Sequence, residues 1–276
     1  MGLKQFLKNT LPEPAVEILR SIKKNIPHTK ATDILAVYGN NIFNRTKHKF
    51  SLEKDAFLLS YDLLGEDIEV FFPYSKFNQP IHMVEEIPSY FQVQGMIRKG
   101  DIVIDAGAWP GDFTTIASKL VGDSGKVIAL EPNPANYQYL ESVLYANKTT
   151  RNVDALKLGL YSSETKVSFA ENGVGSKIEP ETGTTSINTV TLDTIIGKLN
   201  PDRRVIIKMD IEGAEVEAVK GASRSMGNEN MYFMIASYHI VEGKKTKDIL
   251  EPMFRDKGLQ VKHHYPRHLT TYASAK

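Results

Sequence analysis

Residues 102–115 read IVIDAGAWPGDFTT. The apolar run at the start has the length of a buried strand, and it ends on the carboxylate of Asp105. Gly107 then allows a sharp turn and a close approach of the backbone to a ligand, because glycine has no Cβ atom. The pattern from Gly111 to Leu120 is helical, and a helix that starts there offers unpaired N–H groups. The stretch therefore predicts a strand, a ligand-binding turn and a helix.

Strands and helices continue to alternate from this unit to the C-terminus, which predicts a parallel sheet with helices on both faces. Further strands are expected at Lys126–Leu130, Val153–Leu158, Asn188–Leu192, Val205–Met209 and Met231–Ala236, and further helices at Pro134–Ala146, Asp193–Leu199, Ala214–Met226 and Thr246–Lys257. The residues from 159 to 187 are expected to be irregular. The last two strands, Leu259–His264 and Thr270–Ser274, are too close in sequence for a parallel crossover, so they pair antiparallel. The fold class is a doubly wound, mostly parallel α/β sheet.

The N-terminal part of the chain follows a different pattern, typical of an α+β extension. A helix is expected over Pro14–Asn25, and strands at Ala56–Leu59 and Ile68–Phe72 form a hairpin around Gly65. We interpret residues 1–89 as this extension, a cap over the acceptor site.

Residues 90–276 then form the second domain, which starts with a short helix at Tyr90–Ile97. Within it, the Gly- and Thr-rich stretch Glu171–Thr185 is expected to be a mobile insertion over the ligand-binding edge.

Composition and charge narrow the class of protein. The chain has 276 residues, 34 Lys and Arg against 33 Asp and Glu, and no Cys, which excludes disulfide scaffolds and thiolate metal sites. Residues 1–50 carry nine basic and three acidic side chains, a charge of +6, so the rest of the chain carries −5. The basic segment is either a solvated helix face or a contact to an anionic membrane surface or substrate. No apolar run is long enough to span a membrane, and the expected location is cytoplasmic.

Two acidic residues at strand ends indicate the kind of ligand. A nicotinamide site would show G-x-G-x-x-G after the first strand, whereas this turn carries Asp105, which suits a cationic ligand. Glu131 ends the next strand and can accept both hydroxyls of a ribose. Adenosine with a positively charged methionine tail, S-adenosyl-L-methionine, satisfies both acids. The alternatives are a helix cap for Asp105 and an exposed strand-end charge for Glu131.

Several longer motifs resemble the FkbM-type S-adenosylmethionine-dependent methyltransferases. The motifs are IVIDAGA at 102–108, LEPNP at 130–134, VTLD at 190–193 and IKMDIEGAE at 207–215. The resemblance covers the chain from about Tyr90 to the C-terminus. It implies the seven-stranded, Rossmann-like class I methyltransferase fold and methylation of a hydroxyl on a sugar, a glycan or a small secondary metabolite. The cofactor-binding residues expected from the motifs and strand ends are Asp105, Gly107, Ala108, Trp109, Gly111, Glu131, Pro132, Asn133, Leu160 and Asp210.

The chain departs from the family pattern at three places. Trp109-Pro110 replaces the pair expected after Ala108, and Trp109 either walls the methionine tail or packs on the helix. Leu160 stands where many methyltransferases have an Asp for the adenine amino group. Ser237-Tyr238-His239 replaces Glu-x-His after the fifth strand, so an acidic side chain is missing there.

Methyl transfer to oxygen requires removal of the hydroxyl proton, and His239 is the expected general base because histidine titrates near neutrality. Asp210 is expected to orient the acceptor or the methionine amine. The alternative for His239 is a packed or surface histidine, and the alternative for Asp210 is a cap on the helix that follows it. Glu215 is expected to be structural. His263, His264 and His268 are expected at a polar hairpin tip without nearby acids, so no metal site is expected.

Function and partners follow from these residues. The sequence predicts a methyltransferase that acts on a hydroxyl-bearing small molecule or glycan. The alternatives are a nicotinamide-dependent oxidoreductase, which Asp105 disfavours, and a methyltransferase-like binding module without activity. The acidic catalytic half argues against nucleic acid as a partner. The sequence gives no signal for the oligomeric state or the identity of the acceptor.

Overall fold

The computed structural model describes residues 48–51, 55–63, 66–74, 90, 96–170, 177–178, 185–200, 202–264 and 268–275, and all structural statements below concern these residues. The chain divides into two compact units, Met1–Val84 and Glu85–Lys276.

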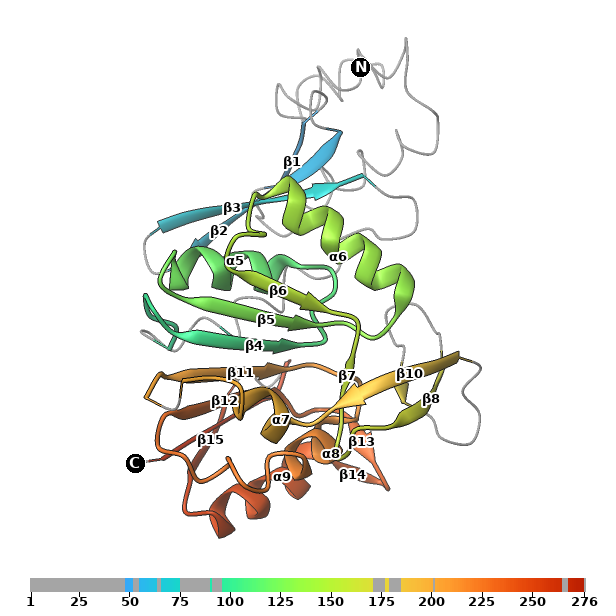
Figure 1. Ribbon diagram of the computed structural model, residues 1–276, viewed down its shortest axis with the longest axis vertical. Helices are drawn as coiled ribbons and strands as arrows, with labels where there is room; N and C mark the ends of the chain where they lie inside the picture. The colour runs from blue at the N-terminus through green and yellow to red at the C-terminus, as the bar shows by residue number, and fades with distance from the viewer. Residues whose placement is uncertain are drawn as a thin grey trace, which may run out of the picture. The chain divides into compact units, whose positions relative to one another are not determined.

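The second unit is built on a seven-stranded sheet with the order β15-β16-β12-β11-β4-β5-β6 (Figure 1). Its strands are β4 (Ile102–Ala106), β5 (Lys126–Leu130), β6 (Val153–Leu156), β11 (Val205–Met209), β12 (Met231–Ala236), β15 (Gln260–His264) and β16 (Thr270–Ser274). β16 pairs antiparallel with both β12 and β15, and the other pairings are parallel. The chain order reverses between β4 and β11, which is where doubly wound sheets bind ligands. The predicted doubly wound, mostly parallel seven-stranded sheet and its antiparallel final strands are confirmed.

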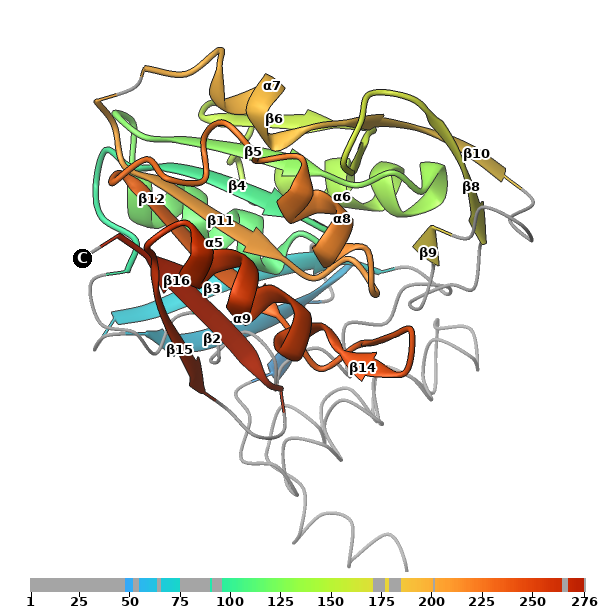
Figure 2. The ribbon, with the colours of Figure 1, turned by 90° about the horizontal axis from the view of Figure 1, so that it is seen from below.

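Helices cover the two faces of this sheet (Figures 1 and 2). They are α5 (Asp112–Val121), α6 (Pro134–Ala146), α7 (Leu192–Ile196), α8 (Glu215–Lys220) and α9 (Thr246–Asp256). Apolar residues of α7, α8 and α9 pack with alternate residues of the strands, including Ile102, Ile104 and Ala106 of β4, in one core. The residues between them in each strand face the other side of the sheet. Val103 of β4 is fully buried on that side, which is covered by α5, the helix that connects β4 to β5. Both faces of the sheet are therefore covered, as in other parallel sheets.

The residues between β6 and α7 differ from the expectation. An irregular stretch was expected to 187, but the structure has a second sheet with the order β7-β10-β8-β9. Its strands are β7 (Gly159–Leu160), β8 (Lys166–Ala170), β9 (Lys177–Ile178) and β10 (Thr185–Val190). β10 replaces the strand expected at Asn188–Leu192 and lies outside the seven-stranded sheet. These strands are short, and their pairing depends on contacts that no local sequence period encodes.

Two further elements, the helix after β11 and the segment after β12, differ from the expectation. The helix expected over Ala214–Met226 ends at Lys220, and Gly221 follows it as the C-cap. Ala222 and Met226 are buried in turns, which explains why the apolar pattern continues past the helix. A small hairpin of β13 (Ile240–Val241) and β14 (Lys244–Lys245) was not expected.

The first unit contains a three-stranded antiparallel sheet of β1 (His48–Ser51), β2 (Ala56–Leu63) and β3 (Glu66–Pro73), which confirms the predicted hairpin. The helix expected over Pro14–Asn25 lies outside the described residues, as does Gly65. The described part of the chain contains no helix that is long and apolar enough to cross a membrane. The interpretation of residues 1–89 as a cap stays a prediction.

Two other expected elements lie only partly within the described residues. Of the insertion at Glu171–Thr185, residues 177–178 and 185 are described, and they belong to the second sheet. Of the helix expected at Tyr90–Ile97, Tyr90 is helical, residues 91–95 lie outside the described residues, and Met96 and Ile97 form a bend.

Candidate active site

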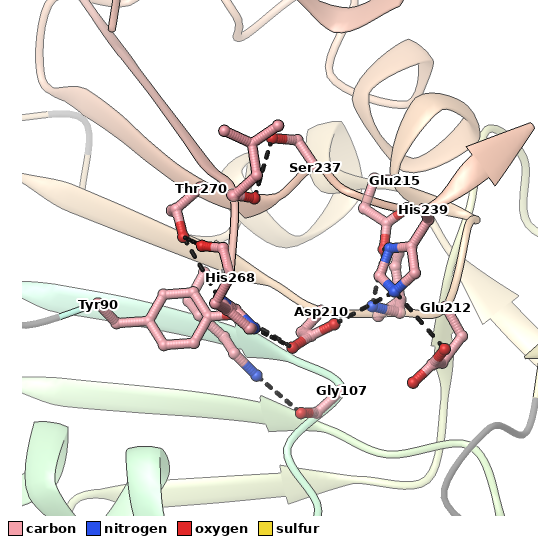
Figure 3. Close-up of polar contacts among 12 residues, drawn as sticks. Tyr90, Gly107, Asp210, Glu212, Glu215, Ser237, His239, His268 and Thr270 are labelled. Carbon is pink, nitrogen blue, oxygen red and sulfur yellow. Dashed lines mark hydrogen bonds and ion pairs between the residues drawn. The ribbon is translucent and has the colours of Figure 1, made fainter. Parts of the chain in front are cut away.

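Polar side chains gather at the edge of the seven-stranded sheet where the parallel strands end (Figure 3). Asp210 follows β11, and His239 comes shortly after β12. Because β16 runs antiparallel, its first residues lie at this same edge, and His268 lies two residues before its start at Thr270. Tyr90 reaches the group from far away in the sequence. The topology therefore brings together side chains from four separate stretches.

Asp210 is at the centre of this group. Tyr90 Oη donates a hydrogen bond of 3.0 Å to Asp210 Oδ2. His268 Nε2 lies 3.5 Å from the same oxygen, and His239 Nε2 lies 3.8 Å from Oδ1. Burial raises the pKa of Asp210, but the contact with His268 and the positive charge of Lys208 outweigh burial and hold this pKa below its usual range. Asp210 is therefore an anion at neutral pH.

His239 is surrounded by three carboxylates. Its Nδ1 lies 3.0 Å from Glu215 Oε1, and its Nε2 lies 3.5 Å from Glu212 Oε2 and 3.8 Å from Asp210 Oδ1. Burial lowers the pKa of His239, but the contacts with Glu212 and Glu215 outweigh burial and raise it to about 10. The expectation that His239 titrates near neutrality is wrong, because its ring is already protonated at pH 7 in this environment. A ring that holds this proton would have to lose it before it could act as a general base.

Asp105, expected to hold the cofactor, is fully buried. Lys208 Nζ lies 3.0 Å from Asp105 Oδ1, and Thr114 Oγ1 donates a hydrogen bond to Oδ2. Lys208 Nζ also donates to Gly107 O at 2.8 Å, so it connects the strand-end acid to the turn. The positive partner of Asp105 in this structure is therefore a lysine from the neighbouring strand.

Gly107 and Gly111 shape the turn, and both have positive φ angles of 74° and 105°. A Cβ atom on Gly107 would lie 1.9 Å from the carbonyl oxygen of Asp210. A Cβ atom on Gly111 would lie 3.0 Å from Leu140 Cδ1, so this glycine allows α5 to pack on α6. The two glycines are thus required by the protein's own backbone and helix packing.

Glu131 lies at the end of β5 and is 5% exposed. Its Oε1 accepts a hydrogen bond of 2.9 Å from Asn133 N, and its Oε2 accepts one of 3.4 Å from Trp109 N. Burial raises the pKa of Glu131 to about 7, although these backbone donors act in the opposite direction. The carboxyl group is therefore poised to change its charge near neutral pH, and it links the turn after β4 to the end of β5.

The remaining expected cofactor residues surround Glu131 or lie in the core. Ala108 N donates to Leu130 O at 3.0 Å, and Asn133 caps α6 by accepting hydrogen bonds from Ala135 N and Asn136 N. Pro132 is half-buried between them. Leu160 belongs to β7, and its side chain is 2% exposed and packs in the hydrophobic core. Its contact with the adenine ring stays a prediction.

Comparison with known proteins identifies the family. Residues 105–258 match the description "Methyltransferase FkbM domain". The chain belongs to the FkbM methyltransferase family. The recognition made from the motifs is confirmed. S-adenosyl-L-methionine, the expected cofactor, is the methyl donor of this class of enzyme.

Individual proteins similar to this FkbM methyltransferase cover it only in part. A hexuronic acid methyltransferase, AglP, of Haloferax volcanii is 28% identical over 153 residues, which are 54% of this chain and 59% of that protein. The chain thus matches about three fifths of the length of this relative. Among solved structures, the methyltransferase FkbM of Methylobacillus flagellatus is 16% identical with a TM-score of 0.48, covering 94% of this chain and 60% of that one. Fibrillarin of Aeropyrum pernix, solved with S-adenosyl-L-methionine bound, is 12% identical with a TM-score of 0.45, covering 79% of this chain and 93% of that one.

Sequence reasoning missed three residues of the FkbM site, namely Tyr90, Lys208 and His268. His268 is buried and contacts the rings of Tyr90 and Tyr238, with centroids 5.3 Å and 4.9 Å away. The expectation of a polar tip without nearby acids is wrong for His268, which faces Asp210. It is also wrong for His263, whose Nε2 lies 2.9 Å from Glu251 Oε2. The antiparallel direction of the last strand was the available signal, because it starts at the ligand-binding edge.

Proposed function

We propose that this FkbM protein transfers the methyl group of S-adenosyl-L-methionine to a hydroxyl group of a sugar acid of the hexuronic type. The observation that carries the proposal is the direct backbone contact of Gly107 in the turn after β4 with Asp210 in the acidic and histidine cluster. A donor held at the turn would present its methyl group to an acceptor held at the cluster. The similarity to the hexuronic acid methyltransferase supports the acceptor class.

On the donor side, we propose that the Glu131 carboxylate accepts the ribose hydroxyls, as expected from the sequence. The indole Nε1 of Trp109 is buried and has no hydrogen-bond partner within the described residues, so it is a donor that a ligand can satisfy. Asp105, whose charge Lys208 balances, is proposed to fix the turn rather than to contact the methionine amine. Gly107, Ala108 and Asp210 complete the proposed donor site through their backbone.

On the acceptor side, Glu212 replaces His239 as the proposed base. Its side chain is 35% exposed, more than that of Asp210 or Glu215, so an acceptor can reach it. The acceptor oxygen attacks the methyl carbon, the carbon–sulfur bond breaks with its electron pair left on sulfur, and S-adenosylhomocysteine is released. The hydroxyl proton passes to Glu212. Asp210 and His239, both expected as catalytic residues, are proposed to hold the acceptor through hydrogen bonds.

The test is a transfer assay with S-adenosyl-L-methionine labelled in its methyl group and paired acceptors, glucuronic acid glycosides and the matching neutral glucosides. We expect labelled methyl ether from the uronic acid. Glu212→Gln should lower kcat by about 10²–10⁴-fold, the usual contribution of a general base, with an unchanged Kd for the donor. Glu229→Gln, an exposed acid at the opposite end of β12, is the matched control.

Three results would contradict parts of the proposal. Transfer to the neutral sugar alone would contradict the acceptor class, and a product that mild alkali cleaves would be a methyl ester of the carboxylate instead of an ether. Binding of the donor without any transfer would favour the binding-module alternative. The oxidoreductase alternative is not retained for an FkbM methyltransferase. A cytoplasmic location and a contact of the basic N-terminus with an anionic surface stay predictions.

A further inference from the structure

Three side chains at the end of β11 and β12 lie close enough to share one ion. Asp210, Glu215 and His239 each offer one potential ligand atom, and these atoms all lie within 4.8 Å of one another. Figure 3 shows the His239 ring between the two carboxylates. The residues come from the loop after β11, the start of α8 and the loop after β12. Their convergence therefore depends on the fold and not on a local motif.

Four polar atoms of these three side chains lack hydrogen bonds within the described residues. Within the described residues, no donor reaches Asp210 Oδ1 or Glu215 Oε2, and neither nitrogen of His239 has a partner in hydrogen-bond geometry. Glu215 is fully buried, and the His239 side chain is 10% exposed. Buried polar atoms almost always have a partner, so a group of unsatisfied ones at one point indicates a bound water or ion.

The backbone fixes Glu215 in this position. Its Oε1 accepts hydrogen bonds from Ile211 N at 3.0 Å and from Gly213 N at 3.3 Å. This use of one oxygen holds the carboxylate in place and leaves Oε2 without a hydrogen-bond donor within the described residues. A carboxylate held by outer hydrogen bonds is the usual arrangement for a metal ligand.

Charge also favours a cation over a water molecule. Asp210, Glu212 and Glu215 bring three carboxylates to the His239 ring, at 3.8, 3.5 and 3.0 Å from its nitrogens. The proton on His239 supplies one positive charge to these carboxylates, and an ion of charge +2 that displaces this proton compensates more of their charge.

We propose that Asp210, Glu215 and His239 bind one divalent first-row transition-metal ion, of the class of Mn²⁺ or Zn²⁺. One imidazole nitrogen with carboxylate oxygens suits this class, whereas Mg²⁺ and Ca²⁺ prefer oxygen alone. Two ligands about 2.0–2.2 Å from such an ion lie roughly 3–3.5 Å apart. Nδ1 of His239 lies 3.0 Å from Glu215 Oε1 and Nε2 lies 3.8 Å from Asp210 Oδ1, so the imidazole ring has to turn to direct one nitrogen at an ion that both carboxylates bind.

The ion would have a direct use in the reaction, an extension that rests on the proposed function. Bound at this edge, it would hold the acceptor hydroxyl beside Glu212 in place of the hydrogen bonds from Asp210 and His239, and it would lower the pKa of that hydroxyl. Metal binding itself requires neither the donor nor the acceptor, so it can be tested separately.

The experiment is a titration of the full-length, EDTA-treated protein with Mn²⁺ followed by electron paramagnetic resonance, and with Zn²⁺ followed by calorimetry. We expect one equivalent to bind. Asp210→Asn, Glu215→Gln and His239→Gln should each weaken binding by about 100-fold or more, since even an outer-shell change costs 10–100-fold. Glu229→Gln should bind as the wild type does.

Absence of binding at millimolar metal would overturn the proposal, and so would binding that all three ligand variants leave unchanged. Circular dichroism of the metal-free variants shows whether each one folds. Glu215→Gln keeps the oxygen that accepts the two backbone hydrogen bonds, so it is the variant of choice if His239→Gln does not fold. If the methyl-transfer assay gives no product, the proposed function fails, but the metal titration still tests the metal site independently.

Discussion

Glu131 is a single carboxyl group whose protonation is controlled by its burial at the end of β5. Its pKa rises from an ordinary value of 4.5 to about 7. Between these two values the folded protein binds a proton that the unfolded chain releases, so the stability from this group is complete below pH 4.5 and is lost as the pH rises through 7. This shift of the Glu131 pKa corresponds to ~3 kcal/mol of folding stability.

We therefore expect Glu131→Gln to flatten the pH dependence of stability in the cofactor-free protein. The free energy of unfolding, measured in urea from pH 5 to pH 8, should fall less steeply for the variant than for the wild type. Asp112, whose pKa burial also raises to about 7, should maintain part of the slope. Glu141→Gln, an exposed change on α6, is the control. Equal slopes for Glu131→Gln and the wild type would contradict the prediction.

Single residues also show what the sequence could reveal about the site. Strand-end acids such as Glu131 and Asp210 were identifiable because ligands in doubly wound sheets bind at the carboxyl ends of the strands. The surroundings of those acids were not identifiable. Tyr90 contacts Asp210 across 120 residues of sequence, and the pKa of His239 depends on three carboxylates that converge only in the fold. The positions of the acidic residues of the site were thus predictable from the sequence, whereas the protonation state of His239 was not.

At the level of elements, Lys208 and Asp105 join β11 to β4. They are direct neighbours in the parallel register of the two strands, and their side chains are 6% and 0% exposed. Burial lowers the pKa of Lys208, but Asp105 and Asp210 outweigh burial and keep this pKa above its usual range. Lys208 therefore remains charged inside the sheet.

Lys208→Met should destabilise the protein by about 3–5 kcal/mol, because it leaves Asp105 buried without its cation. Asp105→Asn combined with Lys208→Met should recover part of this loss, since the double variant has no uncompensated charge at this place. Urea unfolding of the two single variants and the double variant measures the coupling. Additive losses would show that the two residues do not act as a pair.

The elements themselves were predictable to different degrees. β5, α6, β11 and β12 have the bounds expected from the sequence, because continuous buried apolar runs and the cap at Asn133 mark them locally. The second sheet was missed because its strands of two to six residues are defined by pairing with distant residues. Apolar periodicity continued through the turns after α8, so it overestimated the length of that helix.

At the scale of the whole molecule, the basic N-terminal segment precedes the unit Glu85–Lys276 that contains the proposed site. We expect deletion of residues 1–45 to leave donor binding intact, since the proposed donor residues all belong to the unit Glu85–Lys276. The acceptor turnover should change if this segment helps to recognise the acceptor. Calorimetry with S-adenosylhomocysteine and the labelled transfer assay measure the two properties separately.

A full-length variant with Arg20, Lys23 and Lys24 changed to Gln is the companion to the deletion, because it separates the role of basic charge from that of the segment. A truncated protein that folds but no longer binds S-adenosylhomocysteine would contradict the cap interpretation.

The contact of Gly107 with the Asp210 carbonyl has a consequence for mutational libraries of this protein. A library sorted only for the amount of folded protein in cells, with no demand for methyl transfer, should still reject almost every substitution at position 107, because any Cβ atom collides with the backbone of the other loop. Substitutions at Glu212 should pass the same sort freely. Intolerance to change would therefore be strongest at a position that performs no chemistry, and a map of tolerated residues would understate the proposed proton acceptor.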